Sequence, residues 1–352
     1  MRSRIRKSGV LCTVTYLDLE SEEQKIYMSN PWENPGTDPG SVEPGQEQKK
    51  DEQEKTPIPS MPKVYKTGAW YVFVPLVIKL VVSMVVSMAA AGIYSFFYMS
   101  NHYDEAVGAM QNQDAMTDMT LTITEQLMQY TTLLEGISAL LVIPIMLFLF
   151  HRDRKNEKFL GIVPNKKASL WQYAGVIGIS AVLCVGVNNL IIIGNLQSMS
   201  ASYQQTTDAL YSASLPVQVI CLGLLVPAAE ELVFRGVMFR RMRQRAGFIR
   251  SAVSASLIFA VIHGNMVQMI YAFFMGMVLC YLYEKYGSVK APVLGHMVMN
   301  LVSIAATETA AYEWMMQQPM RIGIITVVCA AAASSIFVLI QRIDEKPVQP
   351  SV

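Results

Sequence analysis

The sequence predicts an all-α, polytopic membrane protein with about eight transmembrane helices and a polar cavity inside the membrane. Of its 352 residues, 52% are hydrophobic and only 16% are charged, with a mean hydropathy of +0.32, whereas soluble proteins carry about 25% charged residues. Apolar runs recur along the chain, and several reach the roughly 20 residues that a helix needs to cross a bilayer. Glutamate and histidine side chains interrupt some of these runs, which is typical of a functional polar interior.

The apolar runs define the predicted membrane helices. We place them at residues 70–98, 132–150, 172–194, 216–239, 251–264, 266–284, 289–306 and 321–341. The fifth run is short, and the Gly264-Asn265 pair that separates it from the sixth leaves room only for a tight turn. Seven helices are therefore the main alternative to eight.

Composition divides the chain into four regions. Residues 1–65 are polar and contain the turn sequences Asn34-Pro35-Gly36 and Asp38-Pro39-Gly40 and a charged run, so they cannot bury enough apolar surface to fold alone and should form a disordered cytoplasmic tail. Residues 66–170 should hold the first membrane helices with an acidic outer loop and a basic inner loop. Residues 171–342 should form the core that carries the polar groups, and residues 343–352 a cytoplasmic C-terminal tail.

Basic residues occupy alternate loops. One set of connections contains Arg152, Arg154, Lys155, Lys158, Lys166, Lys167, Arg235, Arg240, Arg241, Arg243, Arg245, Arg250, Lys285 and Lys290. The intervening loops contain acidic residues, and the loop at 195–215 has no Lys or Arg. Because Lys and Arg collect on the cytoplasmic side, we expect a plasma-membrane protein with both termini in the cytoplasm, which favours an even helix count. Arg321 is the one exception.

The fourth run carries two adjacent glutamates, Glu230 and Glu231, followed by Arg235. Adjacent helical positions point about 100° apart, so the two carboxylates should have different roles. Glu231 and Arg235 form an i,i+4 pair in the favourable acid-first order, which leaves Glu230 to face a cavity. The alternative is a salt bridge at the membrane edge with both glutamates reaching toward water.

Two histidines lie at comparable depth in neighbouring runs. His263 follows Phe259 by one helical turn, and His296 precedes Asn300 by one turn, so each pair shares a face. An imidazole and an amide on one face can donate two hydrogen bonds to a single oxygen, as an oxyanion hole requires. The alternatives are a polar helix cap for His263 and interhelical hydrogen bonding for His296 and Asn300.

In this order the three motifs, E-E-x-x-x-R, F-x-x-x-H and H-x-x-x-N, resemble the intramembrane glutamic endopeptidases of the CPBP family (CaaX protease and bacteriocin-processing, Abi). The resemblance covers residues 215–307. It implies that residues 171–342 form a protease core in which Glu230 and His263 activate a water while His296 and Asn300 hold the oxyanion. It gives Glu231, Arg235 and Phe259 supporting roles.

The resemblance also implies the partners, namely the lipid bilayer and a peptide or membrane-protein substrate of the prenylated CaaX or bacteriocin-leader kind, with no nucleic acid. It favours a mechanism without a cofactor. Zinc is the alternative, because two histidines and a glutamate can ligate Zn²⁺, although no H-E-x-x-H helix is present. A non-catalytic scaffold or immunity protein of the same fold, and a proton-coupled transporter, are the other functions that the residues allow.

Two further expectations concern geometry. Lys79 lies ten residues into the first run, and a span shifted to 80–98 would leave it reaching to the cytoplasmic edge, which we favour over a buried functional charge. The cavity should open toward the cytoplasm or the inner leaflet, because the Arg-rich helix ends lie there. The polar atoms of Glu230 and His263 should lie about 3 to 6 Å apart, within reach of one shared water.

Overall fold

The computed structural model describes residues 68–344 and residue 346, which belong to a unit spanning residues 60–352. The predicted tail at 1–65 lies outside the described residues, as does most of the tail predicted at 343–352. The described part of the chain contains helices and no strand. The prediction of an all-α protein is therefore confirmed.

Each predicted run coincides with helical structure. The long elements are α1 (Trp70–Asn101), α4 (Thr131–Phe159), α5 (Tyr173–Ile193), the continuous segment Leu215–Arg243, α10 (Phe248–Val261), α11 (Met266–Tyr286), α12 (Lys290–Glu308) and α14 (Pro319–Gln341). Among the described residues, six of these are long and apolar enough to cross a membrane. The other two are α10, which has only 14 residues, and α12, whose apolar surface is interrupted by His296 and Asn300.

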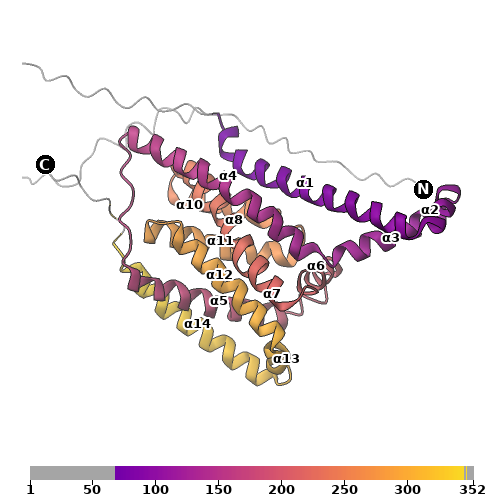
Figure 1. Ribbon diagram of the computed structural model, residues 1–352. Helices are drawn as coiled ribbons and strands as arrows, with labels where there is room; N and C mark the ends of the chain where they lie inside the picture. Colours follow the sequence, from indigo (N-terminus) through magenta and orange to yellow (C-terminus); the bar gives the residue numbers. More distant parts are fainter. Residues whose placement is uncertain (1–67, 345, 347–352) are drawn as a thin grey trace, which may run out of the picture. The chain divides into compact units, whose positions relative to one another are not determined.

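Short helices gather at one end of the bundle. They are α2 (Tyr103–Gln111), α3 (Gln113–Met128), α6 (Ala201–Tyr211) and α13 (Ala311–Met316). Figure 1 shows them on the right, whereas the α4–α5 connection and the last turn of α14 lie on the left. Consecutive long helices run in opposite directions, so the basic connections all lie at the end away from α6 and α13. We call this the basic end, and the other the α6 end.

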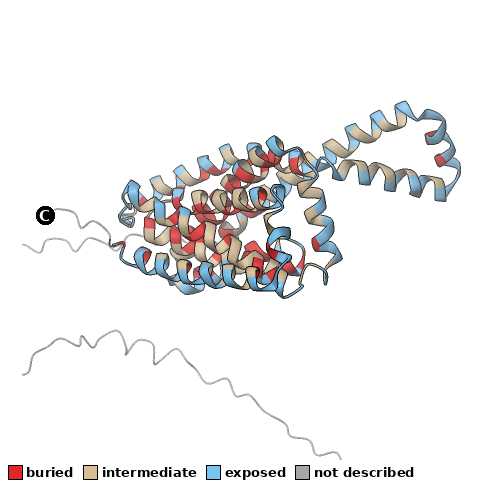
Figure 2. Ribbon diagram, turned by 90° about the horizontal axis from the view of Figure 1, so that it is seen from below, coloured by how far each residue is buried: buried red, intermediate tan, exposed pale blue. Residues whose placement is uncertain are grey.

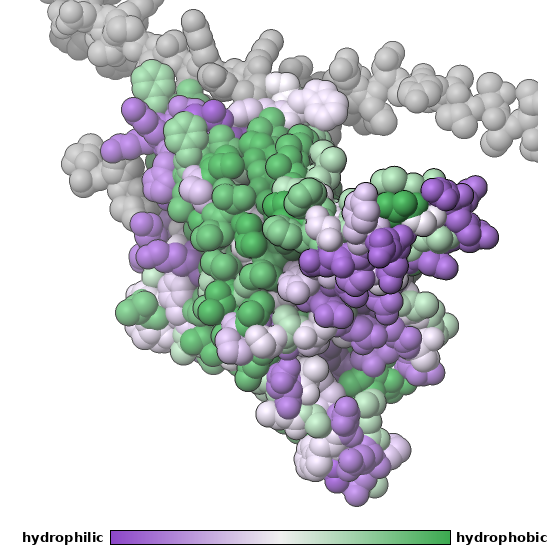
Figure 3. Space-filling model, turned by 45° about the vertical axis from the view of Figure 1, so that its right-hand side comes forward, coloured by the Kyte–Doolittle hydropathy of each residue, from purple (hydrophilic) through white to green (hydrophobic). Residues whose placement is uncertain are grey.

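Apolar side chains fill the interior and also cover the outside. The middle of the bundle is buried and its outer helix faces are exposed (Figure 2). On α1 and α14 those faces carry large apolar residues, including Met84, Phe96 and Val327. Figure 3 shows hydrophobic side chains as a band between two hydrophilic regions. A soluble protein rarely exposes an apolar surface of this extent, so the band is the surface that faces lipid.

The segment Leu215–Arg243 is not a regular helix. It consists of α7 (Leu215–Val217), the π-helix η3 (Gln218–Leu225), α8 (Val226–Glu231), the π-helix η4 (Leu232–Phe239) and α9 (Arg240–Arg243). Pro227 stands at the start of α8, where its missing N–H costs the preceding turn a hydrogen bond. Widened turns of this kind occur mostly at functional sites. The wide turns thus bracket the two glutamates.

Ion pairs close the basic end of the bundle. The guanidinium group of Arg240 pairs with Glu157, and that of Arg241 pairs with Asp153 at 2.6 Å, so α9 is tied to α4. The Tyr71 hydroxyl of α1 donates a hydrogen bond of 2.7 Å to the same Asp153. All three elements are therefore fixed to one another at this end.

Candidate active site

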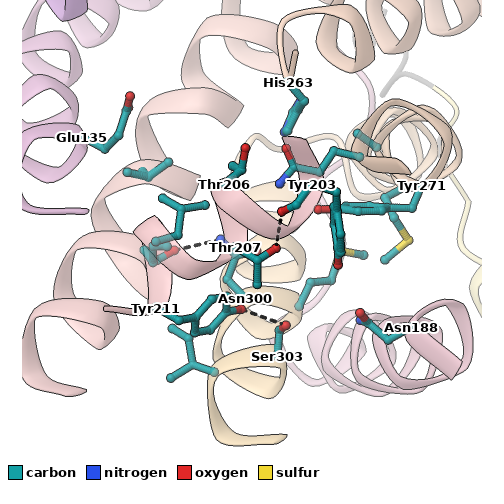
Figure 4. Close-up of a pocket in the computed structure, with 18 of the residues that line it drawn as sticks. Glu135, Asn188, Tyr203, Thr206, Thr207, Tyr211, His263, Tyr271, Asn300 and Ser303 are labelled. Atoms are coloured by element: carbon teal, nitrogen blue, oxygen red, sulfur yellow. Dashed lines mark hydrogen bonds between the residues drawn. The ribbon is translucent and has the colours of Figure 1, made fainter. Parts of the chain in front are cut away.

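The polar residues that the sequence singled out line one cavity of about 670 Å³. Glu230 reaches it from α8, His263 from the turn after α10, and His296 and Asn300 from α12. Figure 4 shows His263 and Asn300 on the wall of this cavity. The prediction that these four groups face one interior space is confirmed.

Glu230 is buried, with 8% of its surface exposed, and its Oε1 atom lies 3.1 Å from the Nζ atom of Lys79 on α1. The expectation that Lys79 reaches to the membrane edge is therefore wrong. The lysine stem runs inward because a buried carboxylate on the facing helix offers its ammonium group a partner. Glu135 of α4 lines the same part of the cavity. Sequence reasoning missed Glu135, although a lone acid near the start of an apolar run was the available signal.

Glu231 turns away from Glu230 and is fully buried. Its Oε1 atom accepts a hydrogen bond of 2.7 Å from Arg235 and one of 2.8 Å from the Nδ1 atom of His296. Arg235 also donates to the carbonyl of Gly276 at 3.1 Å and stacks over the ring of Phe259, 4.6 Å from its centroid. The predicted supporting pair is confirmed, and it also orients one of the site histidines.

His263 is held by the last turn of α10. Its Nδ1 atom lies 2.7 Å from the carbonyl oxygen of Phe259, and the two rings pack edge to face with centroids 4.8 Å apart. A carbonyl oxygen can only accept, so Nδ1 carries the hydrogen in this contact. In the neutral ring Nε2 then has a free lone pair, which makes His263 a proton acceptor. The alternative role of His263 as a polar helix cap accounts for the contact of Nδ1 with Phe259 but not for the position of the ring beside the cavity.

His296 has the complementary arrangement. Its Nδ1 atom donates to the carboxylate of Glu231, which is an acceptor when ionised. Since Nδ1 already carries a hydrogen, Nε2 can carry one too only when the ring is a charged imidazolium. Glu231 would stabilise that positive charge, while Arg235 shares the carboxylate. His296 is thus placed to become a charged hydrogen-bond donor toward the cavity.

Asn300 is positioned by a carbonyl that Pro227 leaves without a partner. Its Nδ2 atom donates a hydrogen bond of 2.8 Å to the carbonyl of Leu222 in η3. In π-helical spacing this carbonyl would bond the nitrogen of residue 227, which in proline has no hydrogen. The amide has two hydrogens, so one stabilises the backbone and the other remains for a ligand.

The outer part of the cavity was not predicted from the sequence. It is lined by hydroxyl and amide side chains, including Tyr203, Thr206, Thr207 and Tyr211 of α6 and Ser303 of α12. The Tyr211 hydroxyl lies 3.1 Å from that of Ser303, which ties α6 to α12 (Figure 4). Single hydroxyl residues on a polar helix carry no pattern that marks them as cavity-lining.

No group of three His, Cys, Asp or Glu side chains within the described ranges has a geometry that could hold a metal ion. The two site histidines direct their Nδ1 atoms to a backbone carbonyl and to a carboxylate, respectively.

The fold and the site define a polytopic, all-α membrane protein with a Glu–His–His–Asn group lining an interior cavity. Residues 212–302 match the family described as type II CAAX prenyl endopeptidase Rce1-like, and this range contains every predicted site residue. The chain is 21% identical over 112 residues to the "Putative membrane peptidase YdiL" of Bacillus subtilis (strain 168). That match covers 32% of the chain and 46% of YdiL, so the chain spans less than half of this curated relative.

No solved structure matches the chain significantly. The family match and the resemblance to YdiL confirm the predicted similarity to the CPBP family of membrane peptidases.

Proposed function

We propose that the protein is an intramembrane endopeptidase that hydrolyses a peptide bond of a membrane-associated substrate with a water activated by Glu230 and His263. One observation supports it above all: four groups from three separate helical segments line one cavity. An isolated polar residue in a membrane helix is readily explained by structure. Hydrolysis, in contrast, requires a base, its partner and oxyanion donors in one place.

In the proposed reaction, the water oxygen attacks the peptide carbonyl carbon while its proton passes to the Glu230 carboxylate. The Nε2 lone pair of His263 accepts a hydrogen bond from the same water and directs it. The tetrahedral intermediate then collapses, the C–N bond breaks, and the proton moves from Glu230 to the leaving nitrogen. The products are a new carboxylate and a new amine, and both catalytic residues return to their initial state.

His296 and Asn300 would hold the negative oxygen of that intermediate. Asn300 offers the amide hydrogen that does not bind Leu222, and charged His296 offers its Nε2 hydrogen. Donors of this kind each contribute about 10²–10³-fold to the rate.

Lys79 serves as a positioning residue in this scheme. Its ammonium group holds the Glu230 carboxylate at the cavity wall, 3.1 Å away, and supplies a positive charge where burial would otherwise oppose ionisation. No metal or other cofactor takes part in the proposal. The substrate class follows from the family: a CaaX-type prenylated peptide or a bacteriocin-type leader, presented at the bilayer of the plasma membrane.

The test is peptide cleavage by the purified, detergent-solubilised protein, followed by mass spectrometry with prenylated CaaX peptides and leader-like peptides in one panel. Glu230→Gln should lower the rate about 10²–10⁴-fold, the range for loss of a general base. Glu313→Gln, which changes an exposed carboxylate of α13, is the matched control and should cleave normally. A chelator should have no effect. Retained cleavage in Glu230→Gln would overturn the proposal.

A non-catalytic scaffold is the second candidate, and one observation favours it: Lys79 already occupies the Glu230 carboxylate. A scaffold would use this ion pair to join α1 to α8 and would cleave no peptide. The same assay separates the two functions, because a scaffold predicts no difference between the wild type and Glu230→Gln on any peptide, while the folded state still depends on the pair.

A further inference from the structure

The cavity lies on one side of the catalytic residues. Along α12 its lining residues recur every three or four positions from His296 to Thr307, which is one helix face about 16 Å long. That face runs toward the α6 end. The other helices agree, since α4 contributes Thr131 and Glu135 from its first turns and α5 contributes its second half, Cys184 to Ile191. Most of the lining thus comes from helix portions nearer the α6 end, whereas α1 contributes Lys79 from its first half.

The opposite side of the site is packed solid. Between Glu230 and the basic end, η4 buries Val233, Phe234, Val237, Met238 and Phe239 completely. These side chains belong to the main apolar core, and beyond them α9 is tied to α4 by its arginine pairs. Protein interiors packed at this density admit no peptide without local unfolding. These side chains lie between the cavity and the Arg-rich end, toward which it was expected to open.

The charges at the two ends give the cavity a direction relative to the membrane. The connections at the basic end hold the Lys and Arg residues, whereas the connections at the α6 end contain none before Arg321. That arginine stacks over Trp314, 3.9 Å from its ring centroid, and is thus held by α13. Because Lys and Arg mark the cytoplasmic side, the α6 end faces away from the cytoplasm.

We infer that the site is reached from the extracytoplasmic side, past α6, and that its substrate is an extended peptide segment exposed on that side, such as part of an exported or outward-facing membrane protein. The peptide chemistry rests on the proposed function, whereas the direction of access does not. Of the two proposed substrate classes, this direction of access favours the leader-type peptide over a prenylated CaaX terminus, which stays in the cytoplasm.

The lining supports a peptide backbone as the occupant. Near α6 it consists mainly of neutral hydrogen-bonding groups, among them Thr206, Thr207, Asn188 and Ser303. Burial raises the pKa of the Tyr203 and Tyr211 hydroxyls, so both stay protonated and able to donate. An extended peptide presents one donor and one acceptor per residue and needs such partners when it leaves water. The cavity volume of about 670 Å³ lies within the roughly 300–1,000 Å³ that is usual for ligand-binding pockets.

α6 forms the roof over this entrance. It is attached at its C-terminal end, where Thr132 donates to the carbonyl of Leu210 at 2.5 Å and Tyr211 meets Ser303. Near its other end the buried Tyr203 packs with Ile191 and Val267 in a small apolar cluster, whereas Gln204 and Gln205 are exposed. The roof therefore separates the cavity from solvent by a single polar helix.

Cysteine labelling tests the direction of access without using activity. In a variant whose five native cysteines are replaced by alanine, single cysteines are introduced as Ser303→Cys in the cavity, Ser198→Cys near the α6 end and Lys167→Cys at the basic end. Right-side-out membrane vesicles are treated with a small, membrane-impermeant, positively charged methanethiosulfonate. We expect Ser198→Cys and Ser303→Cys to react in intact vesicles and Lys167→Cys only after permeabilisation. If Ser303→Cys reacts only after permeabilisation, as Lys167→Cys should, or does not react in either condition, the inference is overturned.

A second measurement keeps the native cysteines, in case their replacement prevents folding. A membrane-impermeant peptide that the purified protein cleaves is added to right-side-out and to inside-out vesicles of the full-length protein. Cleavage in right-side-out vesicles alone is expected, and cleavage in inside-out vesicles alone would overturn the inference. If Ser303→Cys is labelled from outside and no peptide is cleaved in any preparation, the proposed function fails while the direction of access stands.

Discussion

The contact between Lys79 and Glu230 joins α1 to α8, and its removal should destabilise the protein measurably. The perturbation is Lys79→Met, which keeps most of the apolar stem and removes the ammonium group. Both side chains are largely buried, with 15% and 10% of their surfaces exposed, and the charged atoms are 3.1 Å apart. The substitution therefore leaves a buried carboxylate without its partner.

The magnitude follows from that geometry. At an effective dielectric constant of about 20, two unit charges at this distance attract by about 5 kcal/mol. Part of this energy offsets desolvation, and breaking a buried pair costs about 3–5 kcal/mol. Because Glu230 also lines the cavity, we take the lower end of this range and expect the free energy of unfolding to fall by about 3 kcal/mol. In a chain of this size each kcal/mol lowers Tm by about 2 °C, which predicts a fall of about 6 °C.

The assay is thermal unfolding in detergent of the single variants Lys79→Met and Glu230→Gln and of the double variant. The double variant removes both charges, so it should recover most of the lost stability and give a coupling energy of at least about 2 kcal/mol. Lys158→Met changes an exposed lysine of α4 and is the control, with an expected shift below about 2 °C. Additive effects in the cycle, with coupling near zero, would refute the ion pair.

Three further predictions concern the supporting residues. Glu231→Gln leaves the buried guanidinium of Arg235 without its carboxylate and should cost about 3–5 kcal/mol, seen as loss of folded protein after extraction; a normal yield and Tm would contradict this. Gly276→Ala places a Cβ 3.0 Å from Ser256 and 3.1 Å from Arg235, so Tm should fall by the equivalent of about 1–3 kcal/mol; an unchanged Tm would show that the site has room. Asn300→Ala should lower kcat about 10²–10³-fold with little change in KM, and an unchanged kcat would remove Asn300 from the oxyanion site.

Local patterns in the sequence predicted the helices and the pairs within them. Apolar runs determine where helices form in lipid, so each run became helical, with most ends shifted by a few residues and α4 extended by nine beyond its predicted end. The pairing of Glu231 with Arg235 and the shared face of His296 and Asn300 follow from helical spacing alone. The different partners of Glu230 and Glu231 also agree with their separation of about 100° on the helix. These features need no knowledge of how the helices pack.

Features that depend on packing between helices were missed or wrong. A lysine near the start of an apolar run can reach to the membrane edge or turn inward, and only the position of Glu230 on a facing helix decides between them for Lys79. The π-helices on either side of Pro227 change the hydrogen-bond spacing without changing the apolar pattern. The expected direction of the cavity was taken from the arginines alone, and the sequence did not show that buried side chains of η4 lie between them and the cavity.

The central claim is that Glu230 activates a water that attacks the peptide directly, and oxygen transfer tests it most directly. The purified protein cleaves a peptide in a single turnover in water enriched in ¹⁸O, and the products are read by mass spectrometry. Direct attack predicts one ¹⁸O atom in the new carboxylate after the first turnover, no label in the Glu230 side chain, and no labelled product from Glu230→Gln. An unlabelled first product with ¹⁸O found in Glu230 would show that the carboxylate attacks the peptide itself, and would contradict the account.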